Sequence, residues 1–208
     1  CTAGLWIAWF LCWRKWPVAN EFYALLGRMR YITRWGLMRN SFSENIQEHS
    51  HQVAVLAHAL ALIRREILHL PGPDPDKCAV AALYHDASEI LTGDMPTPIK
   101  YYNPEIRNAY KAVEQVAGQR LLDMLPPELR GCYESYVLEN DEDLNPIVKA
   151  ADKLSAHIKC LEELKAGNLE FSTASAQTLS ALEATGREEV RWFLDNCLEP
   201  FIRNLDQL

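Results

Sequence analysis

Two side chains that commonly bind metal ions, His85 and Asp86, are adjacent in the otherwise apolar segment LYHDASEIL, residues 83–91. Glu89 follows Asp86 by three residues, so in a helix its carboxylate lies about one turn further on. Imidazole and carboxylate groups together can hold a divalent cation, and a nearby glutamate can move a proton. A lone His–Asp pair is equally compatible with a salt-bridged helix, so the remainder of the chain has to decide.

The elements that position these residues are predicted to be helices. Long segments with apolar residues at a 3.6-residue period follow one another, separated by Pro, Gly and Asn, and nothing indicates a sheet. We therefore expect an all-α, single-domain protein with helices over residues 20–31, 45–68, 75–92, 104–124, 127–138, 145–166 and 173–198.

Three of these predicted helices carry the candidate site, and each has recognisable end signals. Side chains that accept hydrogen bonds from the first turn favour a helix start, proline fits the first helical position, and glycine favours an end. The predicted start residues are Asn45 with Glu48 as its capping-box partner, Asp74 with Pro75, and Asn145 with Pro146, and the predicted end residues are Gly93 and Gly167.

Helical phase separates the histidines of the first of these helices. Its apolar stripe extends backwards by one four-residue step to His49, which therefore faces the core. His51 and His58 lie roughly 160–200° away from that stripe, at about 100° per residue, and face elsewhere. The stripe comprises Val53, Leu56, Leu60, Ile63 and Ile67.

The other two helices also direct ionisable groups inward. In the second helix His85 and Asp86 lie on neighbouring stripes and can reach one point, with Glu89 a turn away. In the third helix Asp152 borders the apolar face. His157 lies about 140° from Asp152 and is expected at the surface or rim.

Together the three helices aim four side chains at the interior: His49, His85, Asp86 and Asp152. Each alone has a structural explanation, as a core histidine or as a capping or salt-bridged aspartate. Buried charge is costly unless it is paired or bound to a metal, so the joint pattern favours a metal site. Mixed nitrogen and oxygen donors suit Mn, Fe, Co, Ni or Zn better than Ca or Mg, and we expect one divalent transition metal as cofactor.

Length and composition restrict the class of protein. The 208 residues, 49% of them hydrophobic, suffice for one well-buried domain. With 21 basic and 28 acidic residues the net charge is −7, which argues against a nucleic-acid polymer as partner but leaves a small phosphorylated ligand open. The six cysteines are scattered and form no CxxC pair, which favours reduced thiols in a cytoplasmic protein.

The segment CTAGLWIAWFLCW at the start of the sequence is apolar and rich in tryptophan. It is shorter than the roughly 20 residues of a membrane-spanning helix and lacks the basic region that precedes the apolar core of a signal peptide. We therefore predict no stable membrane span, and we treat residues 1–19 as an atypical apolar extension of a domain over residues 20–208. Attachment of the extension to a membrane surface is an open alternative.

The pattern of one histidine, a His–Asp pair and a distant aspartate resembles the H…HD…D signature of HD-domain metal-dependent phosphohydrolases. The likeness extends to whole segments of the bacterial 5′-deoxynucleotidase (YfbR-like) family and covers about residues 20–205. H…HD…D alone is shared by members with different substrates, whereas HDASEILTGDMPTPIK is much more specific for this family. The other matching segments are RWGLMRN, ENIQEHSHQVAVLAHAL and VKAADKLSAHIKCLEELKAGN.

Carried over residue by residue, the resemblance implies a fold, an assembly and a set of roles. It implies an HD-domain helical bundle, a homodimer, and metal ligation by His49, His85, Asp86 and Asp152. It also implies that Glu89 is the general base that activates the water and that Arg34 orients the phosphate. The implied substrate-binding residues are Arg34, Trp35 against the sugar, His49, Asp94 on a sugar hydroxyl, Thr97, Pro98, Ile99 and Lys100 from one loop, and Asp152.

One position departs from the family pattern. Gly36 in RWGLMR stands where proline is expected. A looser turn at this glycine would change how Arg34 and Trp35 are presented, and therefore affect substrate affinity more than chemistry.

The expected reaction is hydrolysis of a deoxyribonucleoside 5′-monophosphate to deoxynucleoside and phosphate. A bound divalent cation lowers the pKa of its water toward about 7, Arg34 neutralises phosphoryl oxygens, and Trp35 crowds a ribose 2′-hydroxyl. The open alternatives are another HD phosphohydrolase, acting on a deoxynucleoside triphosphate, an alarmone or a cyclic dinucleotide, a non-catalytic nucleotide-binding HD module, and a helical scaffold without a site. The absence of a further His–Asp pair and of a basic cluster for a polyphosphate argues against the first, and the complete ligand set argues against the second.

Overall fold

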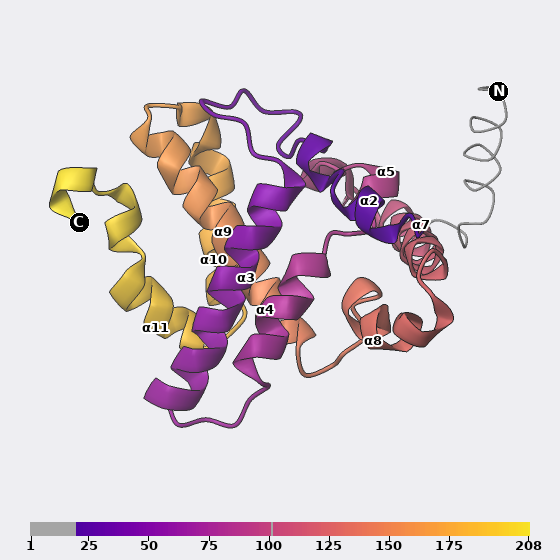
Figure 1. Cartoon of the computed structure of the whole chain (residues 1–208). Coiled ribbons are helices and arrows are strands. Elements are labelled where there is room, and N and C mark those ends of the chain that lie inside the picture. The colour runs from indigo at the N-terminus through magenta and orange to yellow at the C-terminus, as the bar shows by residue number, and fades with distance from the viewer. Residues whose placement is uncertain (1–19, 101) are drawn as a thin grey trace, which may run out of the picture.

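The computed structural model of the chain describes residues 20–100 and 102–208. Within these ranges the regular elements are helices, apart from one isolated bridge between Thr33 and Asn45, so the predicted all-α class is confirmed (Figure 1). No described helix has the length and apolar character needed to cross a membrane. The predicted N-terminal extension, residues 1–19, lies outside the described residues.

Three helices form the centre of the molecule: α3 (Ile46–Leu62), α4 (Pro75–Tyr84) and α9 (Asn145–Lys165) (Figure 1). α3 packs against both of the others, and α4 also contacts α9. Their junction is apolar and fully buried, and it includes Val53, Leu60, Ala82, Ile147 and Leu154. Because all three helices carry or precede candidate ligands, this packing brings those ligands together.

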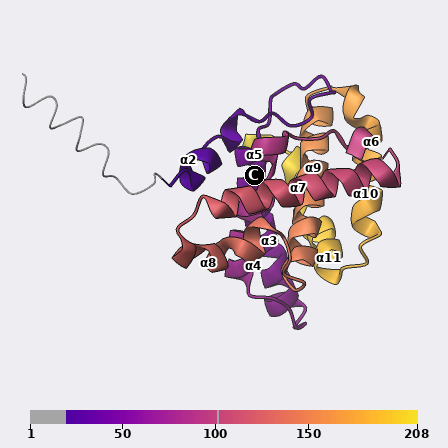
Figure 2. The same cartoon turned by 90° about the vertical axis from the view of Figure 1, so that its right-hand side faces the viewer.

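The remaining helices cover the centre from two sides. α10 (Ser172–Glu183) packs on α9, and α11 (Glu188–Cys197) packs on α3 and on the π-helical turn η3 (Ile63–Ile67) that extends it. On the other side, α8 (Pro127–Val137) packs on α4, and α7 (Pro104–Asp123) packs on α8 (Figure 2). The short elements are α2 (Phe22–Leu26), η2 (Met29–Tyr31), α5 (Glu89–Thr92), α6 (Thr97–Lys100), η4 (Leu169–Phe171), η5 (Glu199–Ile202) and η6 (Leu205–Gln207).

Most of the predicted helix ends are confirmed. Asn45 and Glu48 form the predicted capping box, and the Asp74 carboxylate accepts from the first turn of α4 with Pro75 at its start. The prediction for Asn145 is wrong, because α9 begins at Asn145 with Leu144 as its N-cap. The Asp141 carboxylate instead accepts the backbone N–H groups of Asp143 and Leu144, which satisfies the chain just before the helix.

The predicted helix over residues 75–92 is interrupted in the middle. α4 ends at Tyr84, and a turn over residues 85–88 leads into α5. Nδ1 of His85 donates to the Ala82 carbonyl oxygen at 2.7 Å, and this is the carbonyl that would accept from the backbone N–H of Asp86 in a continuous helix. The His85 side chain therefore takes the place of a backbone hydrogen bond of the helix, and α4 ends here. The turn that follows changes the direction of the chain next to the candidate ligands.

Two further predicted boundaries are wrong. The helix predicted over residues 173–198 is two helices, α10 and α11, because Gly186 takes a left-handed backbone conformation (φ +63°) between them. The segment 20–31 contains two short elements, α2 and η2, in place of one helix.

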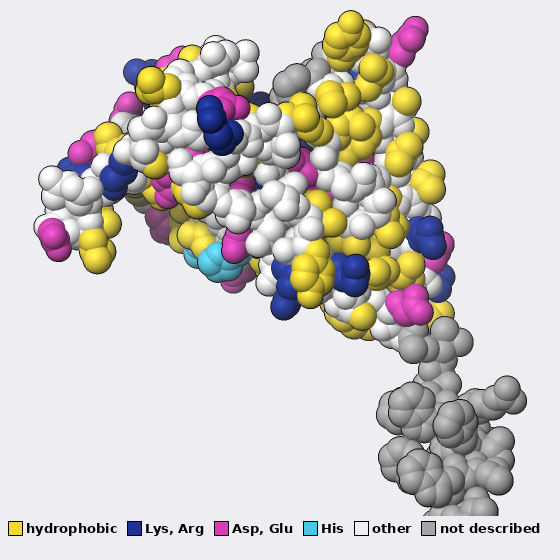
Figure 3. Space-filling view, turned by 90° about the horizontal axis from the view of Figure 1, so that it is seen from above, with side chains coloured by type: hydrophobic (Ala, Val, Ile, Leu, Met, Phe, Trp, Pro, Cys, Tyr) yellow, Lys and Arg dark blue, Asp and Glu magenta, His cyan; other side chains and the backbone are white. Residues whose placement is uncertain are grey.

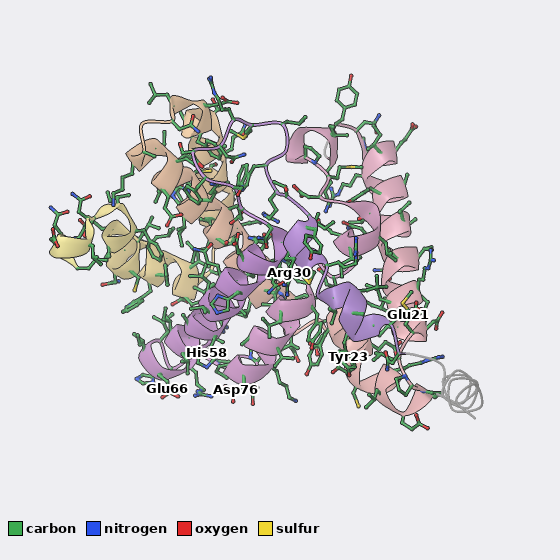
Figure 4. The ribbon with its side chains drawn as sticks, turned by 45° about the horizontal axis from the view of Figure 1, so that its top comes forward. Glu21, Tyr23, Arg30, His58, Glu66 and Asp76 are labelled. Atoms are coloured by element: carbon green, nitrogen blue, oxygen red, sulfur yellow. The ribbon has the colours of Figure 1, made fainter. Side chains whose placement is uncertain are left out.

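The histidines outside the His–Asp pair follow helical phase with one exception. His51 is exposed, and Nε2 of His58 lies 3.4 Å from Oδ1 of Asp76 across α3 and α4, away from the candidate site (Figure 4). The prediction that His157 lies at the surface or rim is wrong, since only 2% of this residue is exposed. α10 covers it, and its Nδ1 lies 2.9 Å from Oγ1 of Thr178 on that helix.

Candidate active site

The four predicted metal ligands lie together at the junction of the three central helices. Nε2 of His49 on α3 lies 3.0 Å from Oδ1 of Asp152 on α9 and 3.6 Å from Oδ2 of Asp86. The same Asp86 oxygen lies 3.2 Å from Nε2 of His85, at the end of α4. One ligand atom each from His49, His85 and Asp152 falls within 4.8 Å of the others, so a single ion between them can contact all three.

Both imidazoles are oriented by hydrogen bonds on their other nitrogen. Oγ of Ser155 donates its hydrogen to Oε1 of Gln52 at 2.7 Å, so it accepts from Nδ1 of His49 at 3.1 Å. Nδ1 of His85 donates to the Ala82 carbonyl oxygen. A proton on each Nδ1 leaves a lone pair on each Nε2, and this tautomer is the one that binds a metal.

The donor set fits a divalent cation. Nε2 of His49 and Nε2 of His85 are buried, and neither has an aligned hydrogen-bond partner. Two such lone pairs facing the carboxylates of Asp86 and Asp152 are costly without a positive charge between them. The mixture of nitrogen and oxygen ligands suits a transition metal better than Ca or Mg.

In the absence of an ion, the charged groups of the cluster shift one another's pKa values. Burial opposes a charge on His85, but the adjacent Asp86 carboxylate raises the pKa of His85 to about 10. Burial likewise opposes charge on Asp86, yet His85, His49 and Arg34 hold its pKa well below the usual range. The pKa of Asp152 is also lowered, because the hydrogen bond and charge of His49 outweigh its burial. The carboxylates therefore attract positive charge, which a bound cation would supply.

Glu89 opens α5 close to this cluster. It is 5% exposed, and its Oε2 is buried without a hydrogen-bond partner. Burial, together with the charges of Asp86 and Asp94, raises the pKa of Glu89 to about 9. A buried carboxyl with a strongly raised pKa beside candidate ligands is a typical proton-transfer group.

Arg34 reaches the cluster from the segment before α3. Its Nη1 donates to Oδ2 of Asp86 at 3.3 Å, and its Nε donates to Oε2 of Glu44 at 3.1 Å. Trp35 donates through Nε1 to the same Glu44 oxygen at 2.9 Å, and its ring centroid lies 5.3 Å from that of Phe171. The structure thus adds Glu44, which sequence reasoning missed, because its pairing depends on the bridge between residues 33 and 45 and no short sequence pattern reports that bridge.

Gly36 does not cause the unusual backbone of this segment. The residue in the left-handed region is Trp35, with φ +60°, and its carbonyl oxygen accepts from the backbone N–H of Met38 at 2.9 Å to close a turn. A Cβ added at Gly36 would meet no atom within 4 Å beyond the neighbouring residues of the chain.

The remaining predicted substrate-binding residues follow α5. Asp94 is half-buried, and burial raises its pKa, although Arg34 opposes the shift, so the two lie within electrostatic reach. Nζ of Lys100 donates to Oε1 of Glu114 on α7 at 2.9 Å, and this lysine also lies within electrostatic reach of Glu89. Ile99 is exposed, and the side chains of Thr97 and Pro98 lie outside what the structure describes. A role for these four residues in nucleotide binding stays a prediction.

Comparison with known proteins identifies the family. Residues 21–201 match the family described as 5′-deoxynucleotidase YfbR-like. The chain belongs to this family. It is 48% identical over 192 residues to a 5′-deoxynucleotidase of Vibrio cholerae, covering 91% of this chain and 98% of that protein. It is 44% identical over 191 residues to the 5′-deoxynucleotidase YfbR of Shigella boydii, covering 91% and 96%.

Solved structures show the same fold as this YfbR-like chain. An HD-domain phosphohydrolase from Listeria innocua superimposes with a TM-score of 0.76 at 21% identity, covering 89% of this chain and 90% of that one. The cyanophage S-2L HD phosphohydrolase, solved with dA and one catalytic Zn²⁺ ion, gives a TM-score of 0.60 at 18% identity, covering 85% and 96%. The predicted family and the HD-type helical fold are therefore confirmed.

Proposed function

We propose that the chain is a metal-dependent 5′-deoxynucleotidase that converts deoxyribonucleoside 5′-monophosphates to deoxynucleosides and phosphate. The observation that carries the proposal is the geometry around Asp86, where two oriented imidazoles, a guanidinium and a buried acid meet. Relatives 44% and 48% identical to the chain are 5′-deoxynucleotidases, which supports the enzyme class.

His49, His85, Asp86 and Asp152 would hold one divalent transition metal, with Co and Mn as first candidates and Zn, Ni or Fe as others. Zinc gains support from the Zn²⁺ ion of the cyanophage HD phosphohydrolase. Such a cation supplies positive charge that lowers the pKa of a coordinated water toward about 7.

In the proposed reaction, water attacks phosphorus and the bond between phosphorus and the 5′ oxygen breaks. Glu89, whose ionised form a bound cation would favour, accepts a proton from the attacking water, and the departing 5′ oxygen takes up a proton from solvent to become the hydroxyl of the deoxynucleoside. Arg34 has N–H groups left beyond those bound to Glu44 and Asp86, and these donate to phosphoryl oxygens.

Selection of deoxyribose is assigned to Trp35 and Asp94. With the Trp35 ring against the 2′ carbon, a ribose hydroxyl there is crowded and lacks a partner, which costs ~1–3 kcal/mol. Asp94 accepts a hydrogen bond from the 3′ hydroxyl. His49, Asp152 and the loop of Thr97 to Lys100 complete the proposed substrate contacts.

The proposal also includes the assembly and its location: a cytoplasmic homodimer built from a domain over residues 20–208. An apolar surface over α5, α6 and α7 supports a protein partner, because hydrophobic side chains gather there (Figure 3). The exposed ones are Leu91, Ile99, Tyr102, Val113 and Val116. Light scattering on the purified protein measures the assembly directly, and a monomer at micromolar concentration would contradict it.

The decisive experiment is phosphate release from deoxy- and ribonucleoside monophosphates, each assayed with Mn, Co, Mg or a chelator. We expect release from the deoxy series only with a transition metal. Glu89→Gln should remove turnover while metal remains bound, and Glu183→Gln, at an exposed position of α10, is the matched control. Product from triphosphates or cyclic dinucleotides alone would overturn the proposed substrate, and unchanged turnover of Glu89→Gln would overturn the proposed base.

A further inference from the structure

We infer that Glu44 is a positioning residue that fixes Arg34 and Trp35 in one geometry and thereby sets the preference for deoxyribose over ribose. The inference rests on the proposed function, in which Arg34 contacts the phosphate and Trp35 contacts the sugar. Neither the family match nor the metal ligands require a role for Glu44.

A single oxygen of Glu44 connects the two side chains. Its Oε2 accepts from Nε of Arg34 at 3.1 Å and from Nε1 of Trp35 at 2.9 Å. The Glu44 backbone carbonyl also accepts the backbone N–H of Arg34 at 2.9 Å. Glu44 is 8% exposed, so water competes poorly for these contacts, and a charged acceptor makes them strong. A shift of this carboxylate would move both side chains together.

The backbone conformation of Trp35 requires stabilising contacts. Its φ of +60° lies in the left-handed region, which a bulky side chain rarely adopts and which persists only where neighbouring contacts impose it. Glu44 on the indole nitrogen and the ring of Phe171 hold the side chain. The backbone is held by Asp94, which takes a hydrogen bond from it, and by Met38 and Asn40, which donate to the carbonyl oxygen at 2.9 Å and 3.4 Å. Of these, Glu44 is the hydrogen-bond partner of the indole ring itself, so the ring position depends on it directly.

Glu44 is itself tied to the helix that carries Asp152. Nζ of Lys159 on α9 donates to the Phe42 carbonyl oxygen at 2.7 Å, and Oε2 of Glu163 accepts the backbone N–H of Ser41 at 2.8 Å. Both charged residues are buried. The segment that ends at Glu44 is therefore fixed relative to α9, and through α9 the substrate-contacting pair is fixed relative to the metal cluster.

The test compares Glu44→Ala and Glu44→Gln with Glu183→Ala, a control at an exposed glutamate of α10. For each purified protein, kcat and KM are measured on a deoxyribonucleotide and on the matching ribonucleotide with saturating Co or Mn. Metal affinity and the unfolding transition are measured on the same samples, which separates positioning from loss of fold.

Glu44→Ala should lower kcat/KM for the deoxyribonucleotide about ten- to a hundredfold, mainly through KM, with metal affinity unchanged. Activity on the ribonucleotide should fall less, so the deoxy-to-ribo ratio drops about tenfold. Glu44→Gln retains an acceptor for Trp35 but loses the charge that orients Arg34. KM should therefore rise, while the deoxy-to-ribo ratio of kcat/KM falls less than in Glu44→Ala. If Glu44→Ala does not fold, Glu44→Gln still tests the role of the carboxylate.

Equal losses on both sugars, or no loss on either, would overturn the role of Glu44 in selectivity. A wild-type enzyme without any preference for deoxyribose would instead contradict the proposed function on which the inference rests. A wild-type preference that Glu44→Ala leaves intact contradicts the inference alone.

Discussion

Nδ1 of His49 lies 3.1 Å from Oγ of Ser155, so a residue on α9 fixes which nitrogen of the His49 imidazole on α3 faces the candidate metal ligands. Ser155→Ala removes the acceptor and leaves a buried N–H without a partner, and the tautomer is then no longer fixed. We expect metal affinity to fall about 10–100-fold, as measured by calorimetric titration of the metal-free protein. Ser180→Ala, on the exposed side of α10, should leave it unchanged. Equal affinities for the two variants would show that Ser155 does not orient the ligand.

The buried pair of Lys159 and Glu163 should dominate the stability of the segment before α3. The two side chains lie 2.5 Å apart with at most 1% of either exposed. Lys159→Met leaves the Glu163 carboxylate buried without its cation, and we expect the free energy of unfolding to fall by ~3–5 kcal/mol in urea denaturation. Lys153→Met, at an exposed position of the same helix, should change it by less than about 0.5 kcal/mol. Similar unfolding curves for the two variants would contradict this account.

Glu163 also gives the fold an acid sensitivity. Burial alone would raise the pKa of Glu163, but hydrogen bonds from Lys159, from Asn168 and from the backbone of Ser41 lower it from 4.5 to about 2. Because the folded-state pKa is the lower one, the stabilisation is complete above the unfolded pKa and is lost as the pH falls toward 2. Urea denaturation should therefore show wild type more stable than Glu163→Gln near neutral pH by about 3 kcal/mol, with the gap closing between about pH 5 and pH 2. A gap independent of pH would mean that the charge of Glu163 contributes nothing.

The clustering of the candidate metal ligands could be predicted from the sequence, and for His49 and Asp152 helical phase was sufficient. His49 and Asp152 lie on or beside apolar stripes of long helices whose ends are marked, and packing those stripes together necessarily brings the ligands together. His85 and Asp86 were also assigned correctly to the cluster, although the helix assumed to carry them ends at Tyr84. Because the two residues are adjacent in the chain, they reach the same cluster even though they do not share a continuous helix.

The parts that could not be predicted depend on contacts between distant segments. His157 is buried because α10 crosses α9, and one apolar stripe on α9 gives no information about a second covering helix. Glu44 reaches Arg34 and Trp35 only because residues 33 and 45 form a bridge, and the buried pair on α9 anchors the same segment. The break at Gly186 is different, because glycine itself is the sequence signal for a left-handed backbone at the end of a helix.

Glu89 should destabilise the metal-free protein while being required for turnover. Burial, with the charges of Asp86 and Asp94, raises the pKa of Glu89 from 4.5 to about 9, so the folded chain holds a proton that the unfolded chain has released. Stability then declines as the pH rises between these two values, and Glu89→Gln, which needs no proton, escapes that loss. In chelator, the Tm of Glu89→Gln should exceed that of wild type by several degrees at pH 8 and match it near pH 5. With metal restored, the same variant should bind the ion yet release no phosphate. A Tm difference of the same size at both pH values would show that the carboxyl does not titrate in the folded protein as its surroundings require.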